Sequence, residues 1–112
     1  MFPNTVELAF ARFQARRDPR ALAIVFDRTA GELLRVARHL ASSEASAEDL
    51  VQSTFVTAIE AADQHRRGEP VLPWLLGILT NQARGARRRS RGQLDPAQVR
   101  RDGLSDVGAE VE

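Results

Sequence analysis

Apolar residues recur every three or four positions along most of the chain, which is the spacing of an amphipathic helix. No stretch alternates apolar and polar residues between hairpin turns, so no strand is predicted. The first apolar stripe predicts a helix over roughly 5–16, with Asn4 and Glu7 placed like a capping pair at its start. Its apolar side holds Val6, Leu8, Ala9, Phe10 and Phe13.

A second helix is predicted over about 19–41. Asp18 is suited to its N-cap and Pro19 to its first helical position, because that position needs no N–H donor and has helical φ. Gly31 lies inside this helix and is a weak point that favours a bend. One apolar stripe runs along the helix through Leu22, Val25, Phe26, Leu33, Leu34, Ala37 and Leu40.

Two more helices follow. Ser46 and Asp49 form a capping box that predicts a third helix over about 47–64, ended by Gly68 and Pro70. The expected buried residues of this helix are Leu50, Val51, Phe55, Ala58, Ile59 and Ala62. The fourth helix is expected to begin at Pro73 and to run to about residue 89.

The predicted fold is therefore all-α, a compact three- to four-helix bundle. At 112 residues and 43% apolar content the chain suffices for one domain with a modest core. We place the helical domain at 1–91 and a flexible acidic linker at 92–112, where Gly, polar and acidic residues dominate. The absence of cysteine excludes disulfides and thiolate metal sites, and neither a metal nor another cofactor is expected.

Charge is distributed unevenly. All 16 basic residues are arginine, which binds phosphate and guanine in a forked geometry. Residues 1–91 carry fourteen arginines and ten acids, whereas 92–112 carry two arginines and five acids. A GC-rich genome would also produce a chain without lysine, so the arginine content alone does not establish nucleic-acid binding.

Three ordered motifs carry a family resemblance over about residues 6–91. Residues 46–55 read Ser-Ala-Glu-Asp-Leu-Val-Gln-Ser-Thr-Phe, and Gly68 and Pro70 then precede Trp74, Ile78 and Asn81 at fixed spacing. The stretches 18–22 and 33–37 look like the first conserved helix of the same family, which precedes these two motifs. Together they resemble region 2 of bacterial sigma factors of the extracytoplasmic-function type, a helical transcription initiation domain.

The resemblance implies two binding surfaces. In that family the first motif docks on the clamp helices of the largest subunit of core RNA polymerase. The resemblance therefore assigns polymerase binding in this chain to Glu48, Asp49, Gln52 and Ser53. Ser53 stands where the family usually has a glutamate. Spacing alone would also allow helix capping and solvated polar positions.

The second surface implied by the resemblance melts the −10 promoter element and captures its non-template strand. The DNA-binding residues expected here are His65, Arg66, Arg67, Asn81, Arg84, Arg87 and Arg88. The arginines at the helix end could alternatively offset the negative end of the helix dipole. Trp74 is expected to be a core anchor, with base stacking as the alternative that the sequence does not separate from it. Phe55 is expected to be a core residue, with a place at the border of the docking face as the alternative.

Two other function classes compete with this interpretation. A protein-interaction module, with an anti-sigma regulator as its partner, would need the docking face but not the arginines. An enzyme is not predicted, because no nucleophile–base pair, phosphate loop or metal-spaced cluster is present. No membrane span or signal peptide is recognisable, which favours the cytoplasm. Because relatives of this type add a C-terminal helix-turn-helix domain, a fragment is favoured over a single-domain member.

Overall fold

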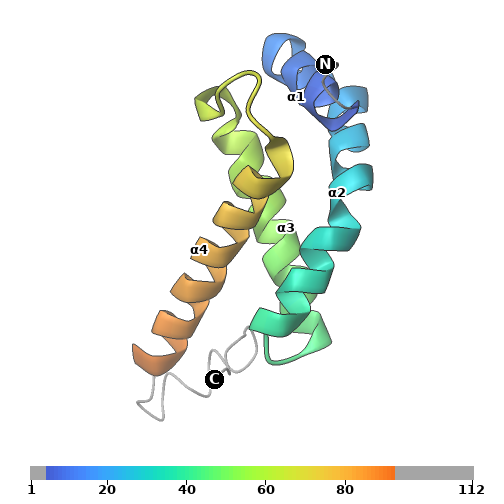
Figure 1. Ribbon diagram of the computed structural model, residues 1–112. Helices are drawn as coiled ribbons and strands as arrows, with labels where there is room; N and C mark the ends of the chain where they lie inside the picture. The colour runs from blue at the N-terminus through green and yellow to red at the C-terminus, as the bar shows by residue number, and fades with distance from the viewer. Residues whose placement is uncertain (1–4, 93–112) are drawn as a thin grey trace.

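The computed structural model describes residues 5–92 of the chain. Four α-helices form most of this range. They are α1 Thr5–Arg16, α2 Pro19–Leu40, α3 Glu44–Glu60 and α4 Val71–Gly92, and a 3₁₀ turn, η1, covers Ala62–Gln64. No strand occurs within these residues, so the all-α prediction is confirmed. Helices α3 and α4 lie side by side with α2 next to α3, while α1 lies at the end that carries the α3–α4 loop (Figure 1).

The junction between α1 and α2 follows the sequence prediction. Arg17 adopts a left-handed φ of 53° and its amide donates to Phe13 O at 2.8 Å, which closes the C-terminus of α1. Asp18 then caps α2, since its carboxylate accepts a hydrogen bond from the Arg20 amide at 3.0 Å, with Pro19 in the first turn. The helix continues through Gly31 to Leu40.

The start of α3 differs from the prediction. The helix begins at Glu44, three residues earlier than expected, and its N-cap is Ser43 rather than Ser46. The Ser43 hydroxyl oxygen accepts from the Ser46 amide at 3.0 Å, so Ser46 supplies the capped donor instead of the cap. The helix also ends at Glu60, and the segment predicted as its last turn forms η1. Ser43 and Ser46 are both suitable cap residues, and the earlier start adds three residues, just under one turn, to the helix.

This reassignment predicts a difference between two serine substitutions. Ser43→Ala is expected to lower the free energy of unfolding by about 1 kcal/mol, because the Ser46 amide loses its acceptor. Ser46→Ala keeps that amide and is expected to cost less than about 0.5 kcal/mol. Urea unfolding of both variants measures the difference, and a larger loss for Ser46→Ala would restore the original assignment.

The start of α4 also differs, and the cause lies elsewhere in the chain. The helix begins at Val71 instead of Pro73, and the Val71 amide donates to a carboxylate oxygen of Glu7 at 2.8 Å. A side chain of α1 therefore caps α4 across the fold. Pro73 lies within the first turn, where its missing N–H removes no intrahelical bond. The expected pairing of Glu7 with Asn4 lies outside the described residues.

The core lies between all four helices and is mainly aliphatic. Its buried apolar residues are Ala9, Phe10, Phe13, Ala21, Val25, Leu33, Ala37, Ala47, Leu50, Ala58, Ala62, Val71, Leu75, Leu79 and Ala83. Leu8 is wrongly placed by the sequence prediction, because it is 59% exposed on the far side of α1. Thr29 and Thr54 are buried without having been predicted, and each hydroxyl donates to the carbonyl four residues earlier, at 2.7 and 2.8 Å.

Candidate protein and nucleic-acid interfaces

The four residues predicted to bind polymerase lie together on the exposed side of α3. Glu48, Asp49, Gln52 and Ser53 are all exposed, and the last three form no hydrogen bond or ion pair with any described side chain. Val56, 54% exposed, lies within the same face one turn further on. Sequence reasoning missed Val56, although its place seven residues after Asp49 and off the buried stripe was a usable signal.

All charged side chains of α3 are acidic. Residues 44–60 contain four acids and no basic residue. Glu44 is held by Arg38, whose Nη2 lies 2.9 Å from its carboxylate, and the hydrogen bond from Arg38 keeps the pKa of Glu44 below its usual range. Glu48, Asp49 and Glu60 have no such ion pair among the described residues. The exposed side of α3 is therefore an acidic surface that suits a basic protein partner.

Asn81, Arg84 and Arg88 share the exposed side of α4, as their spacing predicted. Arg84 Nη1 donates to Asn81 Oδ1 at 2.9 Å, so the two side chains form one unit in the free protein. Gly77 continues this line toward the loop, with no neighbouring atom within 4 Å of where a Cβ would stand. Arg87 differs from Asn81, Arg84 and Arg88 because it is half-buried.

α4 has the opposite charge to α3. Residues 71–92 contain five arginines and no acid. Because α3 and α4 pack against each other, the domain presents an acidic and a basic surface on neighbouring helices. The net charge of +1 conceals this separation. Such a separation directs a polyanion to α4 and away from α3.

The loop between α3 and α4 carries the other two predicted arginines. Arg66 and Arg67 are exposed, and Arg66 pairs with Glu69 at 3.6 Å around Gly68, whose φ is +93°. The loop precedes α4, whereas Arg88 lies near the far end of that helix (Figure 1). At 1.5 Å per residue, Val71 and Arg88 are about 26 Å apart along α4, so a strand that follows the helix from its start to Arg88 would span about eight phosphates at duplex spacing.

His65 was expected to contact DNA, but the structure places its ring inside the fold at 6% exposure. The ring packs against Phe10 and Trp74 with centroid distances of 5.3 and 4.8 Å, and its Nε2 lies 3.4 Å from Pro70 O. This burial was not predictable from the sequence, because a histidine within a charged run is typical of a surface loop. In this conformation His65 shapes the loop and offers no ring surface to a base.

The sequence left two roles open for each of the aromatic residues Trp74 and Phe55. In the structure both side chains pack against other rings. Trp74 is half-buried, with its ring 5.3 Å from that of Phe10. Phe55 stacks on Phe26 of α2 at 3.9 Å between centroids. Both arrangements agree with the interpretation of these residues as core anchors.

Residues 5–92 contain no group of His, Asp and Glu side chains placed to hold a metal ion. Nor does any helix in this range combine the length and apolar character that crossing a bilayer requires.

Comparison with known proteins identifies the family of the chain. Residues 25–93 match the family model described as Sigma-70 region 2. The chain therefore belongs to the sigma-70 region 2 family, as its motifs predicted, and this membership implies a role in transcription initiation. Because the family consists of non-enzymatic factors, the expectation that the chain is not an enzyme is confirmed.

Two curated relatives are similar to the chain over most of its length. The RNA polymerase sigma factor CarQ of Myxococcus xanthus is 34% identical over 90 residues, which cover 80% of this chain and 45% of that protein. The RNA polymerase sigma factor NccH of Alcaligenes xylosoxydans xylosoxydans is 33% identical over 88 residues, which cover 79% of this chain and 47% of that protein. The chain spans about half the length of these relatives. No solved structure matches it.

Proposed function

We propose that this domain binds core RNA polymerase through the exposed side of α3 and captures the non-template strand of the −10 element along α4 and the preceding loop. The polymerase contact is assigned to the clamp helices of the largest subunit, facing Glu48, Asp49, Gln52 and Ser53. The strand contact is assigned to Arg66, Arg67, Asn81, Arg84, Arg87 and Arg88. His65 is assigned the role of shaping the loop.

The observation that carries this proposal is the charge separation between the two helices. An acidic α3 repels nucleic acid and suits a basic protein surface, whereas an α4 without acids attracts phosphates. The membership of the sigma-70 region 2 family supplies the matching pair of partners, a polymerase and a promoter.

The proposed mechanism is binding, without a chemical step on either partner. Extracting a base from the stack costs a few kcal/mol. Contacts of bases with the loop and neutralisation of phosphates by exposed arginines offset that cost. Because Asn81 and Arg84 bond to each other in the free protein, strand binding exchanges that hydrogen bond for contacts with DNA. A base edge can engage both side chains, as an amide and a guanidinium each pair with base edges.

The proposal predicts that Asn81→Ala combined with Arg84→Ala weakens binding of a single-stranded −10 oligonucleotide by about tenfold or more, since both base and phosphate contacts are lost. Each phosphate contact removed should also lower the slope of log affinity against log salt by about 0.7. Fluorescence anisotropy over a series of salt concentrations measures both quantities, while binding to core polymerase is measured separately and is expected to stay unchanged.

The matched control for this double variant is Arg28→Ala. Arg28 is exposed on α2 and has no ion pair among the described residues, so its removal changes net charge without touching α4. Its salt slope should equal that of the wild type. If the double variant and the control behave alike, α4 does not contact the strand and the DNA half of the proposal is wrong.

A second candidate function is a protein-interaction module that binds an anti-sigma regulator or another helical partner without reading DNA. The exposed Val56 within the polar face of α3 favours a protein contact of either kind. The same measurements separate the two functions, because the interaction module would bind a protein through α3 and show no salt-dependent affinity for single-stranded DNA.

Two further parts of the proposal concern context. We propose a cytoplasmic location, where polymerase and promoter DNA would both be available. We also propose that residues 1–91 are the binding domain and that 92–112 is a linker; of that linker only Gly92 lies within the described residues. Limited proteolysis with mass measurement tests this boundary, and cleavage within α4 ahead of residue 89 would contradict it.

A further inference from the structure

Helix α1 lies outside the family match, which begins at residue 25, yet it faces the loop that the proposed function uses. Glu7, Phe10, Gln14 and Arg17 follow one another at intervals of three, four and three residues, so they lie along one side of α1 and its C-terminal end. Each of these four side chains contacts the segment 59–71 or a ring that packs on it. These four side chains therefore form one continuous stripe that contacts the segment 59–71.

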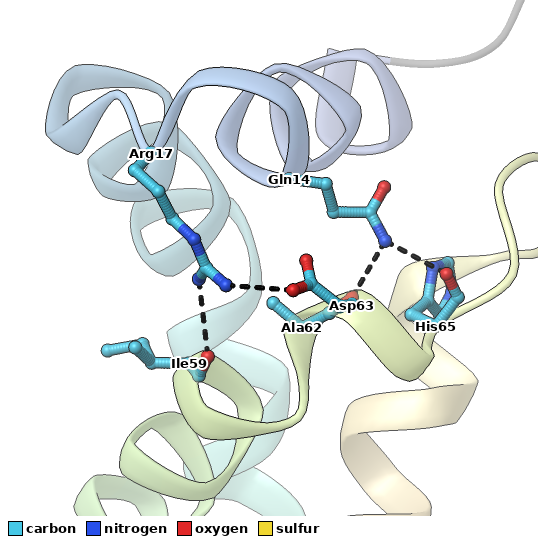
Figure 2. A network of polar contacts seen from close by, with 6 residues as sticks. All are labelled: Gln14, Arg17, Ile59, Ala62, Asp63 and His65. Atoms are coloured by element: carbon cyan, nitrogen blue, oxygen red, sulfur yellow. Dashed lines mark hydrogen bonds and ion pairs between the residues drawn. The ribbon is translucent and has the colours of Figure 1, made fainter.

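Gln14 forms the central contact of this stripe. Its Nε2 donates to Ala62 O at 2.8 Å and to His65 O at 2.9 Å (Figure 2). Both acceptors are main-chain carbonyls, which cannot donate, so only the NH₂ group of the amide can face them. Ala62 O lies within η1 and also accepts from the His65 amide at 3.2 Å, whereas His65 O lies immediately after η1. One side chain thus fixes the path of the chain as it leaves η1.

The contacts on either side of Gln14 hold the two ends of the same segment. The Arg17 guanidinium lies 3.4 Å from Ile59 O and 3.3 Å from the Asp63 carboxylate (Figure 2). At the other end, the Glu7 carboxylate accepts from the Val71 amide. α1 therefore contacts the segment before, within and after the loop.

The loop itself depends on where His65 is held. The Gln14 bond fixes the His65 carbonyl, while the ring of the same residue packs on Phe10 and reaches Pro70 O. Between His65 and Pro70 the chain turns at Gly68, and the Glu69 amide donates to Arg66 O at 3.1 Å. Displacing His65 would therefore move the turn that presents Arg66 and Arg67.

We propose that α1 is a positioning element for the strand-capturing loop and that Gln14 is its principal positioning residue. The inference rests on the proposed function for the role of the loop, but it concerns a helix and a residue to which that function assigns nothing. This role requires no contact between Gln14 and DNA. Gln14 acts by keeping the loop in the one conformation that capture requires, so that the ordering cost is met before the strand arrives.

The test uses Gln14→Met and Gln14→Glu in the full chain. Methionine keeps the length of the side chain and removes the two donors, whereas glutamate keeps the shape and sets a carboxylate against two carbonyl oxygens. We expect Gln14→Met to weaken binding of the −10 strand about tenfold and Gln14→Glu to weaken it further. Binding to core polymerase, through α3, should stay within about twofold of the wild type.

The matched control is Gln82→Met. Gln82 Nε2 donates to Thr57 Oγ1 at 2.8 Å between α4 and α3, so the control also removes one half-buried glutamine that joins two helices. It is expected to lower global stability by a similar amount without weakening strand binding. Hydrogen exchange supplies a second readout, in which the Gln64, His65 and Glu69 amides should exchange about tenfold faster in Gln14→Met alone.

Each outcome decides between the explanations. Loss of strand binding with faster loop exchange in Gln14→Met, and neither change in Gln82→Met, supports the inference. Equal losses in both variants would reduce Gln14 to a contributor to general stability, and unchanged loop exchange in Gln14→Met would overturn the inference directly. If the wild-type protein itself bound no strand, the proposed function would fail, and loop exchange alone would then decide whether Gln14 holds the loop.

Discussion

Replacing Asp49 by arginine is expected to weaken binding to core RNA polymerase by at least about thirtyfold. Asp49 is exposed, has no partner among the described residues and lies within an acidic face that a basic partner surface would complement. The substitution sets a cation against that surface, and like charges brought together at an interface cost several kcal/mol. Titration of labelled protein with core polymerase measures the change. Folding should be unaffected, because the side chain makes no contact that the fold needs.

Asp27→Arg is the matched control for this prediction. Asp27 is also exposed, but on α2, and the substitution makes the same change of charge away from the proposed docking face. Its polymerase affinity should stay within about twofold of the wild type, and single-stranded DNA should bind no more weakly to either variant. An equal loss in both variants would mean that net charge, and not the α3 face, governs polymerase binding.

The largest effect on stability is expected from Phe10→Ala. Phe10 is 1% exposed, and its ring contacts those of Phe13, His65 and Trp74. Removing it leaves a cavity where α1 meets the loop and should cost about 3–5 kcal/mol of unfolding free energy. For a domain of this size the unfolding midpoint should fall by about 15–30 °C. Circular dichroism measures the loss, and fluorescence of Trp74, the single tryptophan, reports the disturbed contact.

Leu8→Ala provides the control within the same turn of α1. Leu8 is 59% exposed, so its truncation should cost less than about 0.5 kcal/mol. A cost for Phe10→Ala no larger than that for Leu8→Ala would show that α1 is not packed as described. Because α1 precedes the family match, a large effect would also establish that the folded unit extends beyond residues 25–93.

Much of the fold could be predicted from local patterns. The apolar stripe and the Asp18 cap of α2 lie next to each other in sequence, so the limits of that helix were predictable to within a residue. The polar side of α3 was predictable for the same reason, since the periodicity that marks Leu50 as buried also marks Asp49 and Gln52 as exposed. On α4, the shared side of Asn81, Arg84 and Arg88 follows from spacing alone.

The contacts that shape the candidate site were not predictable in this way. Gln14 bonds to carbonyls 48 and 51 residues further along the chain, and main-chain acceptors carry no residue-specific signal. The first turn of α4 is capped by Glu7, 64 residues away, so the local sequence around Pro73 placed its start two residues late. His65 was expected at the surface for a similar reason, because its burial depends on rings from α1 and α4.

The sequence by itself determined the all-helical class, the family and the residues that face outward on each helix, because helical periodicity and caps act over a few neighbouring positions. Tertiary structure alone decided how the loop is held, since the stripe from Glu7 to Arg17 acts on groups more than forty residues distant. It also decided that the acidic and basic helices become neighbours. That arrangement depends on how four apolar stripes share one core, which no single stripe can specify.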